Sequence, residues 1–158
     1  MGSVEFKVPQ HQFEDIAQEW KIFLAPFPDF DLDYQIIFDS QIPTIIDSEN
    51  RKLRIDFEND AENYKKHKSS ITSEPLSRAL GAGKKGLRFV DLSAGMAVDA
   101  VFLAQLGYLV TAIERNPLLY LANSNALKNC SLEWSQNLQF IHSEAVDFLK
   151  TTTLDFDV

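Results

Sequence analysis

The chain has 158 residues, 45% of them hydrophobic, and a formal net charge of −8. This length fits one globular domain with a small addition, and no apolar run reaches the roughly 18 residues that a membrane span needs. The acidic balance argues against broad binding to nucleic acids, because phosphate affinity comes from clustered Lys and Arg. The single cysteine, Cys130, fits a reducing cytoplasm, and the N-terminus lacks the pattern of a secretory signal. No zinc-ligand spacing of His and Cys is found, so no metal site is expected.

The first half of the chain, residues 1–80, is predicted to be a small α+β region. Helical spacing of apolar residues predicts an amphipathic helix over 13–24. A small antiparallel sheet is predicted from three apolar, β-rich runs, at 34–38, 44–46 and 53–57. Two further helices are predicted, over 60–68 and 73–80, before a glycine-rich linker that begins at Gly81.

The second half, residues 81–158, alternates strands with helices. This alternation predicts an α/β fold with a parallel, doubly wound, Rossmann-like sheet. The expected strands are 88–92, 108–113, 138–141 and the start of a fourth at 156–158, and the expected helices are 98–106, one that opens at Pro117, and 145–150. Asn116 is the predicted N-cap of the second helix, and Gly107 is the predicted end of the first. Because four parallel strands are few for this fold, the chain is expected to be the N-terminal part of a longer protein.

A glycine turn follows the first of these strands, and a carboxylate ends the second. The turn reads Asp91-Leu-Ser-Ala-Gly95-Met-Ala-Val-Asp99, and the second strand runs into Glu114. An ionised acid at that tip can accept hydrogen bonds from both hydroxyls of an adenosine ribose, so Glu114 is the predicted ribose contact. A strand-tip carboxylate of this kind is expected to carry little packing. The βαβ unit therefore predicts a site for a nucleoside cofactor.

The cofactor expected at this site is S-adenosylmethionine. A dinucleotide fingerprint uses three glycines to admit pyrophosphate, whereas this turn has only Gly95. Asp91 would repel pyrophosphate but could orient the ammonium end of a methionine moiety, and Asp99 adds a second negative charge nearby. Glu144, after the third strand, could meet an adenine amino group, and acids on successive strand ends suit a cationic sulfonium. Taken singly, Asp99 is explained equally well as a helix-start acid and Glu114 as a solvated loop carboxylate.

Two local basic clusters, 64–68 and 84–88, stand out in this acidic chain. In the first, Lys65, Lys66 and Lys68 are candidate contacts for RNA phosphates. A solvated helix face explains the same residues equally well.

Five segments between residue 51 and the chain end form a further set: Arg54-Ile-Asp-Phe57, Tyr64-Lys-Lys-His67, Glu74-Pro-Leu-Ser-Arg-Ala-Leu-Gly81, the turn 91–100 and Glu114-Arg-Asn-Pro117. Together they resemble the ribosomal RNA small-subunit methyltransferase J family. Members of this family are class I S-adenosylmethionine-dependent enzymes. The resemblance implies methylation of the exocyclic 2-amino group of a guanosine in small-subunit ribosomal RNA.

The resemblance also implies particular contacts. Three pairs of residues would contact the cofactor: Val98 and Asp99, Glu114 and Arg115, and Glu144 and Ala145. The family motif after the first strand resembles D-A-T-A-G-L-G-R-D-A, and here Ala97 and Val98 replace its second glycine and its arginine. In the family an Asp-Pro-Met-Phe/Tyr-Pro motif after strand four holds the guanine amino group. The chain stops at Val158, short of that motif, so no catalytic residue is assigned and the chain alone is expected to be inactive. A non-catalytic cofactor-binding module and an NAD-type oxidoreductase stay open as alternatives.

Overall fold

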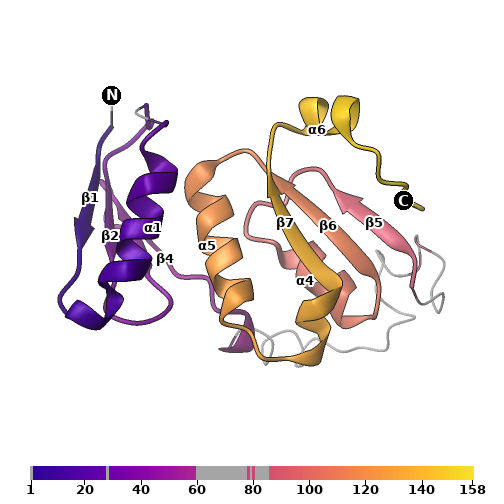
Figure 1. The fold of residues 1–158 in the computed structure, drawn as a ribbon, viewed down its shortest axis with the longest axis horizontal. Coiled ribbons are helices and arrows are strands. Elements are labelled where there is room, and N and C mark those ends of the chain that lie inside the picture. Colours follow the sequence, from indigo (N-terminus) through magenta and orange to yellow (C-terminus); the bar gives the residue numbers. More distant parts are fainter. Residues whose placement is uncertain (1, 28, 60–77, 79, 81–85) are drawn as a thin grey trace. The chain divides into compact units, whose positions relative to one another are not determined.

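A computed structural model of the chain describes all residues except 1, 28, 60–77, 79 and 81–85. The chain forms two compact units, Met1–Asp56 and Phe57–Val158 (Figure 1). The predicted boundary at residues 80–81 adjoins the stretch that is not described and stays a prediction. Nearly all of the two helices predicted over 60–68 and 73–80 likewise falls outside the described residues.

The first unit is built on a four-stranded sheet in the order β1-β2-β3-β4. Its strands are β1 (Val4–Lys7), β2 (Tyr34–Ile37), β3 (Thr44–Asp47) and β4 (Lys52–Leu53). The β2, β3 and β4 strands pair antiparallel, as predicted, but β1 pairs parallel with β2, so the sheet is mixed. The alternation of Val4 and Phe6 with charged neighbours is a strand pattern that the sequence interpretation missed.

One helix contributes Ala17, Trp20 and Leu24 to the core of this first unit. A short 3₁₀ turn, η1 (His11–Phe13), leads into α1 (Glu14–Leu24), which agrees with the predicted helix over 13–24. Trp20 is 2% exposed and meets the fully buried Phe38 edge-on, with ring centroids 5.5 Å apart. This aromatic contact is the favoured edge-to-face geometry.

The strand predicted over 53–57 is wrong beyond its first residue. β4 ends at Leu53, and Phe57 begins a helical turn. Ile55 is buried without a strand partner, whereas Phe57 packs in the second unit against Phe140 and Trp134, both with ring centroids 6.2 Å away. The burial of both Ile55 and Phe57 therefore does not indicate a β-strand. Ile55 belongs to the first unit, whereas Phe57 packs in the second.

The second unit contains a parallel sheet in the order β5-β6-β7. Its strands are β5 (Arg88–Asp91), β6 (Leu109–Glu114) and β7 (Leu138–His142). Between and after them lie α4 (Val98–Gln105), α5 (Pro117–Lys128), the 3₁₀ turn η2 (Glu133–Asn137) and α6 (Ala145–Thr151) (Figure 1). This arrangement confirms the predicted Rossmann-like α/β fold, because alternating strands and helices give a parallel sheet.

The predicted helix ends are confirmed in this unit. The side chain of Asn116 accepts hydrogen bonds from the backbone nitrogens of Leu118 and Leu119, at 2.9 and 3.2 Å, and Pro117 is the first helical residue. Gly107, with φ of +91°, closes the end of α4. None of the helices in the described part of the chain is long and apolar enough to cross a membrane.

The last residues of the chain run along the free edge of β5. The Val158 nitrogen donates to the Arg88 carbonyl at 3.3 Å, and the Val158 carbonyl accepts from the Val90 nitrogen at 3.0 Å. That is the hydrogen-bond pattern of a parallel pair opposite Phe89. These contacts agree with the predicted start of a fourth strand, although residues 156–158 form no regular strand. The chain therefore runs from β5 through β6 to β7 on one side and then returns to the opposite side of β5. This makes β5 a topological switch point, and ligands of such sheets bind beyond the carboxyl ends of the strands at that point.

Candidate cofactor site

The turn after β5 has two residues in the left-handed region, Gly95 with φ of +55° and Ala97 with φ of +59°. The Ala97 nitrogen donates to the Ala94 carbonyl at 2.7 Å, and the Ala94 nitrogen donates to the Ile113 carbonyl at 2.9 Å. Glycine adopts this conformation freely, whereas alanine does so at a cost of roughly 1–2 kcal/mol. Ala97 therefore keeps the left-handed backbone of the tight turn, at the position where the motif of the methyltransferase J family has its second glycine.

Glu114 at the tip of β6 is built into this turn. Its side chain is buried, with the residue only 7% exposed. One carboxylate oxygen accepts from the Gly95 nitrogen at 2.8 Å, and the other accepts from the Asn116 nitrogen at 2.7 Å. The expectation that this carboxylate carries little packing was wrong, because it joins two loops. Each oxygen keeps one further lone pair, so two acceptor positions are left for ligand hydroxyls.

The other side of Gly95 is held by Asn123, a residue that the sequence interpretation missed. Asn123 lies on the buried face of α5 and has no exposed surface. Its amide nitrogen donates to the Gly95 carbonyl at 2.7 Å. Asn123 and Asn125 are both buried in α5, and asparagine between the alanines of this helix is the signal that could have found Asn123.

Three acids predicted from the sequence come close enough here to affect one another. Burial raises the pKa of Asp91, and the carboxylates of Asp99 and Glu114 raise it further. A hydrogen bond of 3.0 Å from the Ser93 nitrogen to Asp91 opposes this rise. Such a site favours a positive ligand, because a cation would offset both the burial of the Asp91 charge and its repulsion.

The loop after β7 lies beside the loop after β6. Glu114 pairs in register with His142, whose ring Nε2 lies 2.9 Å from the Arg115 carbonyl oxygen. Arg115 forms an exposed ion pair with Glu144, with an N–O distance of 3.8 Å, and Ala145 begins α6 directly afterwards. Exposed pairs add little stability, so this one is free to exchange its partners for a ligand.

Apolar side chains are exposed around the acids of the turn. Leu92, Met96 and Val98 are 36%, 57% and 46% exposed, respectively. Val98 was predicted as a contact, whereas Leu92 and Met96 were not. Exposed apolar side chains next to buried polar groups match the mixed surface of a nucleoside cofactor.

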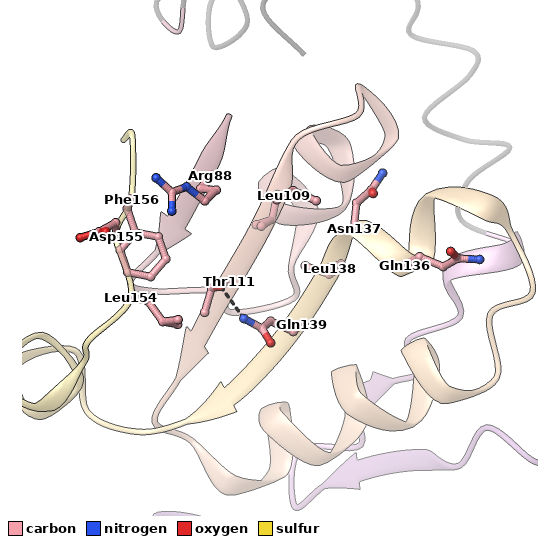
Figure 2. A pocket seen from close by; sticks show the side chains of 11 residues that line it. Arg88, Leu109, Thr111, Gln136, Asn137, Leu138, Gln139, Leu154, Asp155 and Phe156 are labelled. Atoms are coloured by element: carbon pink, nitrogen blue, oxygen red, sulfur yellow. Dashed lines mark hydrogen bonds between the residues drawn. The ribbon is translucent and has the colours of Figure 1, made fainter. Parts of the chain in front are cut away.

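A hollow of about 300 Å³ lies elsewhere on the sheet of this unit (Figure 2). Arg88, Leu109 and Leu138, which line it, are the first residues of β5, β6 and β7. In its middle, Gln139 donates to the Thr111 hydroxyl at 2.7 Å, so these polar groups already satisfy each other. The hollow is at the amino ends of the strands and is therefore not the expected cofactor site.

Two other sequence-based expectations concern the rest of the chain. In the part of the chain that the structure describes, no group of three His, Cys, Asp or Glu residues could hold a metal ion. The proposed RNA contacts Lys65, Lys66 and Lys68 lie outside the described residues.

The sequence of this chain matches a family model described as "Putative SAM-dependent methyltransferase" over residues 17–158. The chain belongs to this family. It is 37% identical over 103 residues to the ribosomal RNA small subunit methyltransferase J of Bdellovibrio bacteriovorus, which covers 60% of this chain and 41% of that protein. The protein of the same name from Shewanella pealeana is 25% identical, over all of this chain and 66% of its own length. The chain thus spans about two fifths to two thirds of these relatives.

A solved structure shares the fold. The SAM-dependent methyltransferase from Neisseria gonorrhoeae superposes with a TM-score of 0.67 over 92% of this chain and 62% of its own, at 16% sequence identity. The match confirms the class I, Rossmann-like fold. The resemblance to the methyltransferase J family is confirmed by the named relatives, and S-adenosylmethionine is the cofactor of the family to which the chain belongs.

Proposed function

We propose that this chain is the S-adenosylmethionine-binding part of a methyltransferase that acts on small-subunit ribosomal RNA. The observation that carries the proposal is the buried Glu114, which holds the Gly95 turn and keeps two acceptor positions at the carboxyl end of β6. Relatives named as methyltransferases of that RNA support the choice of substrate. A cytoplasmic location belongs to the same proposal.

Each candidate residue has a role in this proposal. Glu114 accepts hydrogen bonds from the ribose hydroxyls, and Glu144 accepts one from the adenine amino group. Asp91 and Asp99 face the positive ammonium and sulfonium groups. The remaining contacts of the cofactor are with Gly95, Val98, Arg115 and Ala145.

The reaction that we propose is transfer of a methyl group to the exocyclic 2-amino group of a guanosine. The cofactor supplies a methyl group already activated by its sulfonium, so the task of the protein is to position the partners and exclude water. The target base must leave its stack to reach the turn. This specificity is taken from the family resemblance, and the motif that would hold the guanine, Asp-Pro-Met-Phe/Tyr-Pro, does not occur in the 158 residues. We therefore propose that this chain alone binds the cofactor without methylating RNA.

The distribution of charge supports an RNA contact near Lys65, Lys66 and Lys68. Residues 60–85 carry six Lys or Arg and three Asp or Glu, whereas residues 1–56 carry five and eleven. Phosphate binding requires local positive charge, and this stretch supplies it within an acidic chain. We propose that these three lysines contact RNA phosphates.

Calorimetric titration with S-adenosylhomocysteine and with NAD separates the cofactor classes. We expect S-adenosylhomocysteine to bind and NAD to give no heat, because a single-glycine turn flanked by Asp91 disfavours pyrophosphate. Binding of NAD alone would overturn the proposal in favour of an oxidoreductase.

A methyl-transfer assay tests the substrate. Small-subunit ribosomal RNA and labelled S-adenosylmethionine would be incubated with this chain and with the chain extended through its full reading frame. We expect labelled N2-methylguanosine only with the extended chain. If the extended chain binds cofactor but transfers no methyl group, the non-catalytic module becomes the better description; transfer by the 158 residues would show that the base-holding loop was misplaced.

A further inference from the structure

The burial of Asn123 costs free energy of folding. It has no exposed surface, and its side-chain oxygen is buried without a hydrogen-bond partner among the described residues. An unpaired buried acceptor opposes folding, because it gives up its hydrogen bonds to water and receives nothing in return. Leucine has the same number of side-chain heavy atoms and the same branching, and it would carry no such penalty on the buried face of α5. Stability of the helix packing therefore does not explain an amide here.

What the amide provides is a donor for the glycine turn. Its nitrogen lies 2.7 Å from the Gly95 carbonyl oxygen, across 28 residues of sequence. Glu114 holds the nitrogen of the same glycine at 2.8 Å. Gly95 is thus held by hydrogen bonds on both sides, from the tip of β6 and from the interior of α5. As a glycine at φ of +55°, it has no side chain that would otherwise restrain its backbone.

The hydrogen bond from Asn123 also sets the direction of a second group, the Met96 N–H. The Gly95 carbonyl and the Met96 N–H belong to one planar trans peptide, so they point in opposite directions. With the carbonyl held toward α5, the Met96 N–H points away from that helix. The same peptide leads into the exposed side chain of Met96 and the left-handed Ala97.

We propose that Asn123 is a positioning residue for cofactor binding, which fixes the Gly95–Met96 peptide in the orientation that the nucleoside cofactor meets. The proposal rests on the proposed function, because it assumes that the cofactor binds at this turn. Asn123 itself is buried and touches the ligand only through Gly95.

The main variant is Asn123→Leu, and its matched control is Asn129→Leu. Asn129 also donates its side-chain nitrogen to a backbone carbonyl, that of Asn125, at 2.8 Å, but at the far end of α5. We expect Asn123→Leu to weaken S-adenosylhomocysteine binding about tenfold, the ratio that corresponds to one hydrogen bond. Its melting temperature without ligand should change little, because removal of the unpaired oxygen offsets the loss of the donor to the Gly95 carbonyl. The control should keep the affinity of the unaltered chain.

A third variant, Asn123→Asp, tests for rescue by a donor. A protonated aspartic acid can donate to the Gly95 carbonyl, whereas an ionised one cannot. Its affinity, divided by that of the unaltered chain at the same pH, should rise as the pH is lowered, while the ratio for Asn123→Leu should stay flat. Taking the ratio removes any pH dependence that the unaltered chain itself shows at this acidic turn, where Asp91, Asp99 and Glu114 gather. A purely structural role for Asn123 would leave the ratio for Asn123→Asp independent of pH.

Amide hydrogen exchange tests, without any ligand, whether Asn123 holds the turn. The Ala97 N–H is bonded within the turn, and we expect it to exchange about tenfold faster in Asn123→Leu than in the unaltered chain. Failure of the unaltered chain to bind S-adenosylhomocysteine would remove the proposed function, yet unchanged exchange alone would overturn the holding role of Asn123. If the unaltered chain and Asn123→Leu bind equally well, the positioning role is wrong and the proposed function stands.

Discussion

Two carboxylates, one in each unit, show how burial changes the meaning of the same contact. Asp33 in the first unit accepts hydrogen bonds from the Ser3 nitrogen at 2.7 Å and the Ser3 hydroxyl at 2.8 Å, and it is exposed. Glu114 in the second unit also accepts two, but it is only 7% exposed. Water can readily replace the partners of Asp33, whereas it reaches the buried carboxylate of Glu114 much less easily. The two hydrogen bonds of Asp33 therefore lie on an exposed surface, whereas those of Glu114 fix the turn at which we propose that the cofactor binds.

The largest effect should come from the core of the first unit, through Phe38→Ala. Phe38 is fully buried and packs with Trp20 and Phe6, so its removal should cost about 3–5 kcal/mol of unfolding free energy. S-adenosylhomocysteine should still bind, because the residues proposed to contact it all belong to the second unit. Calorimetric melting and titration of the same sample measure both quantities, and a parallel loss of binding would show that the site depends on the first unit.

Next in size is Glu114→Ala, with Asp33→Ala as its matched control. Loss of Glu114 leaves the Gly95 and Asn116 N–H groups without the partner they have now, which should cost about 1–3 kcal/mol of unfolding free energy and at least tenfold in cofactor affinity. Asp33→Ala should change neither quantity appreciably. Chemical denaturation and calorimetry provide the two readings. Equal changes of unfolding free energy and of affinity in the two variants would contradict the difference that we draw between these two carboxylates.

The third prediction concerns pH and uses Asp91→Asn. The pKa of Asp91 is raised in the folded chain above the ordinary 3.8, so its ionisation destabilises the fold as the pH rises between 3.8 and the raised value. Asp91→Asn should therefore be more stable than the unaltered chain at neutral pH and equally stable below the ordinary value. It should also reduce the preference for S-adenosylmethionine over S-adenosylhomocysteine severalfold, because a charge-charge term of roughly 1 kcal/mol is lost.

Denaturation at several pH values and paired titrations measure these effects. The stability gain should disappear in acid, whereas the change in ligand preference should be largest at neutral pH. A preference that is unaffected at neutral pH would mean that Asp91 does not face the sulfonium.

The smallest effect is expected for Ala97→Gly, compared with Ala100→Gly. Glycine at 97 relieves a left-handed alanine, by roughly 1–2 kcal/mol, but loses a buried methyl group and gains freedom when unfolded. The net change should be within about 0.5 kcal/mol of zero, with unchanged cofactor affinity. Ala100 lies in α4, where glycine should cost about 1–2 kcal/mol. Similar losses at both positions, measured by denaturation, would contradict the strain at Ala97.

Much of the second unit was predictable from the sequence because its signals are local. Apolar runs, the Asn116-Pro117 start and the Gly107 end each lie within a few residues of the element that they define. The carboxyl ends of parallel strands share one edge, so the meeting of the Gly95 turn with Glu114 also followed from the element order. The first unit was predicted less well, since the parallel partner of β1 lies about thirty residues away and strand pairing over that distance leaves no local mark.

By itself, the sequence determined the order of the elements in the second unit, the Rossmann-like class and the loop on which a nucleoside site should lie. Only the tertiary structure decided what each polar side chain does there. Whether Glu114 is a solvated acid or a buried clamp depends on which backbone groups surround it, and the role of Asn123 depends on a glycine 28 residues earlier. The physical reason is that secondary structure follows from short-range backbone preferences, whereas the energy of a polar group depends on its burial and its partners, which exist only once the chain has folded.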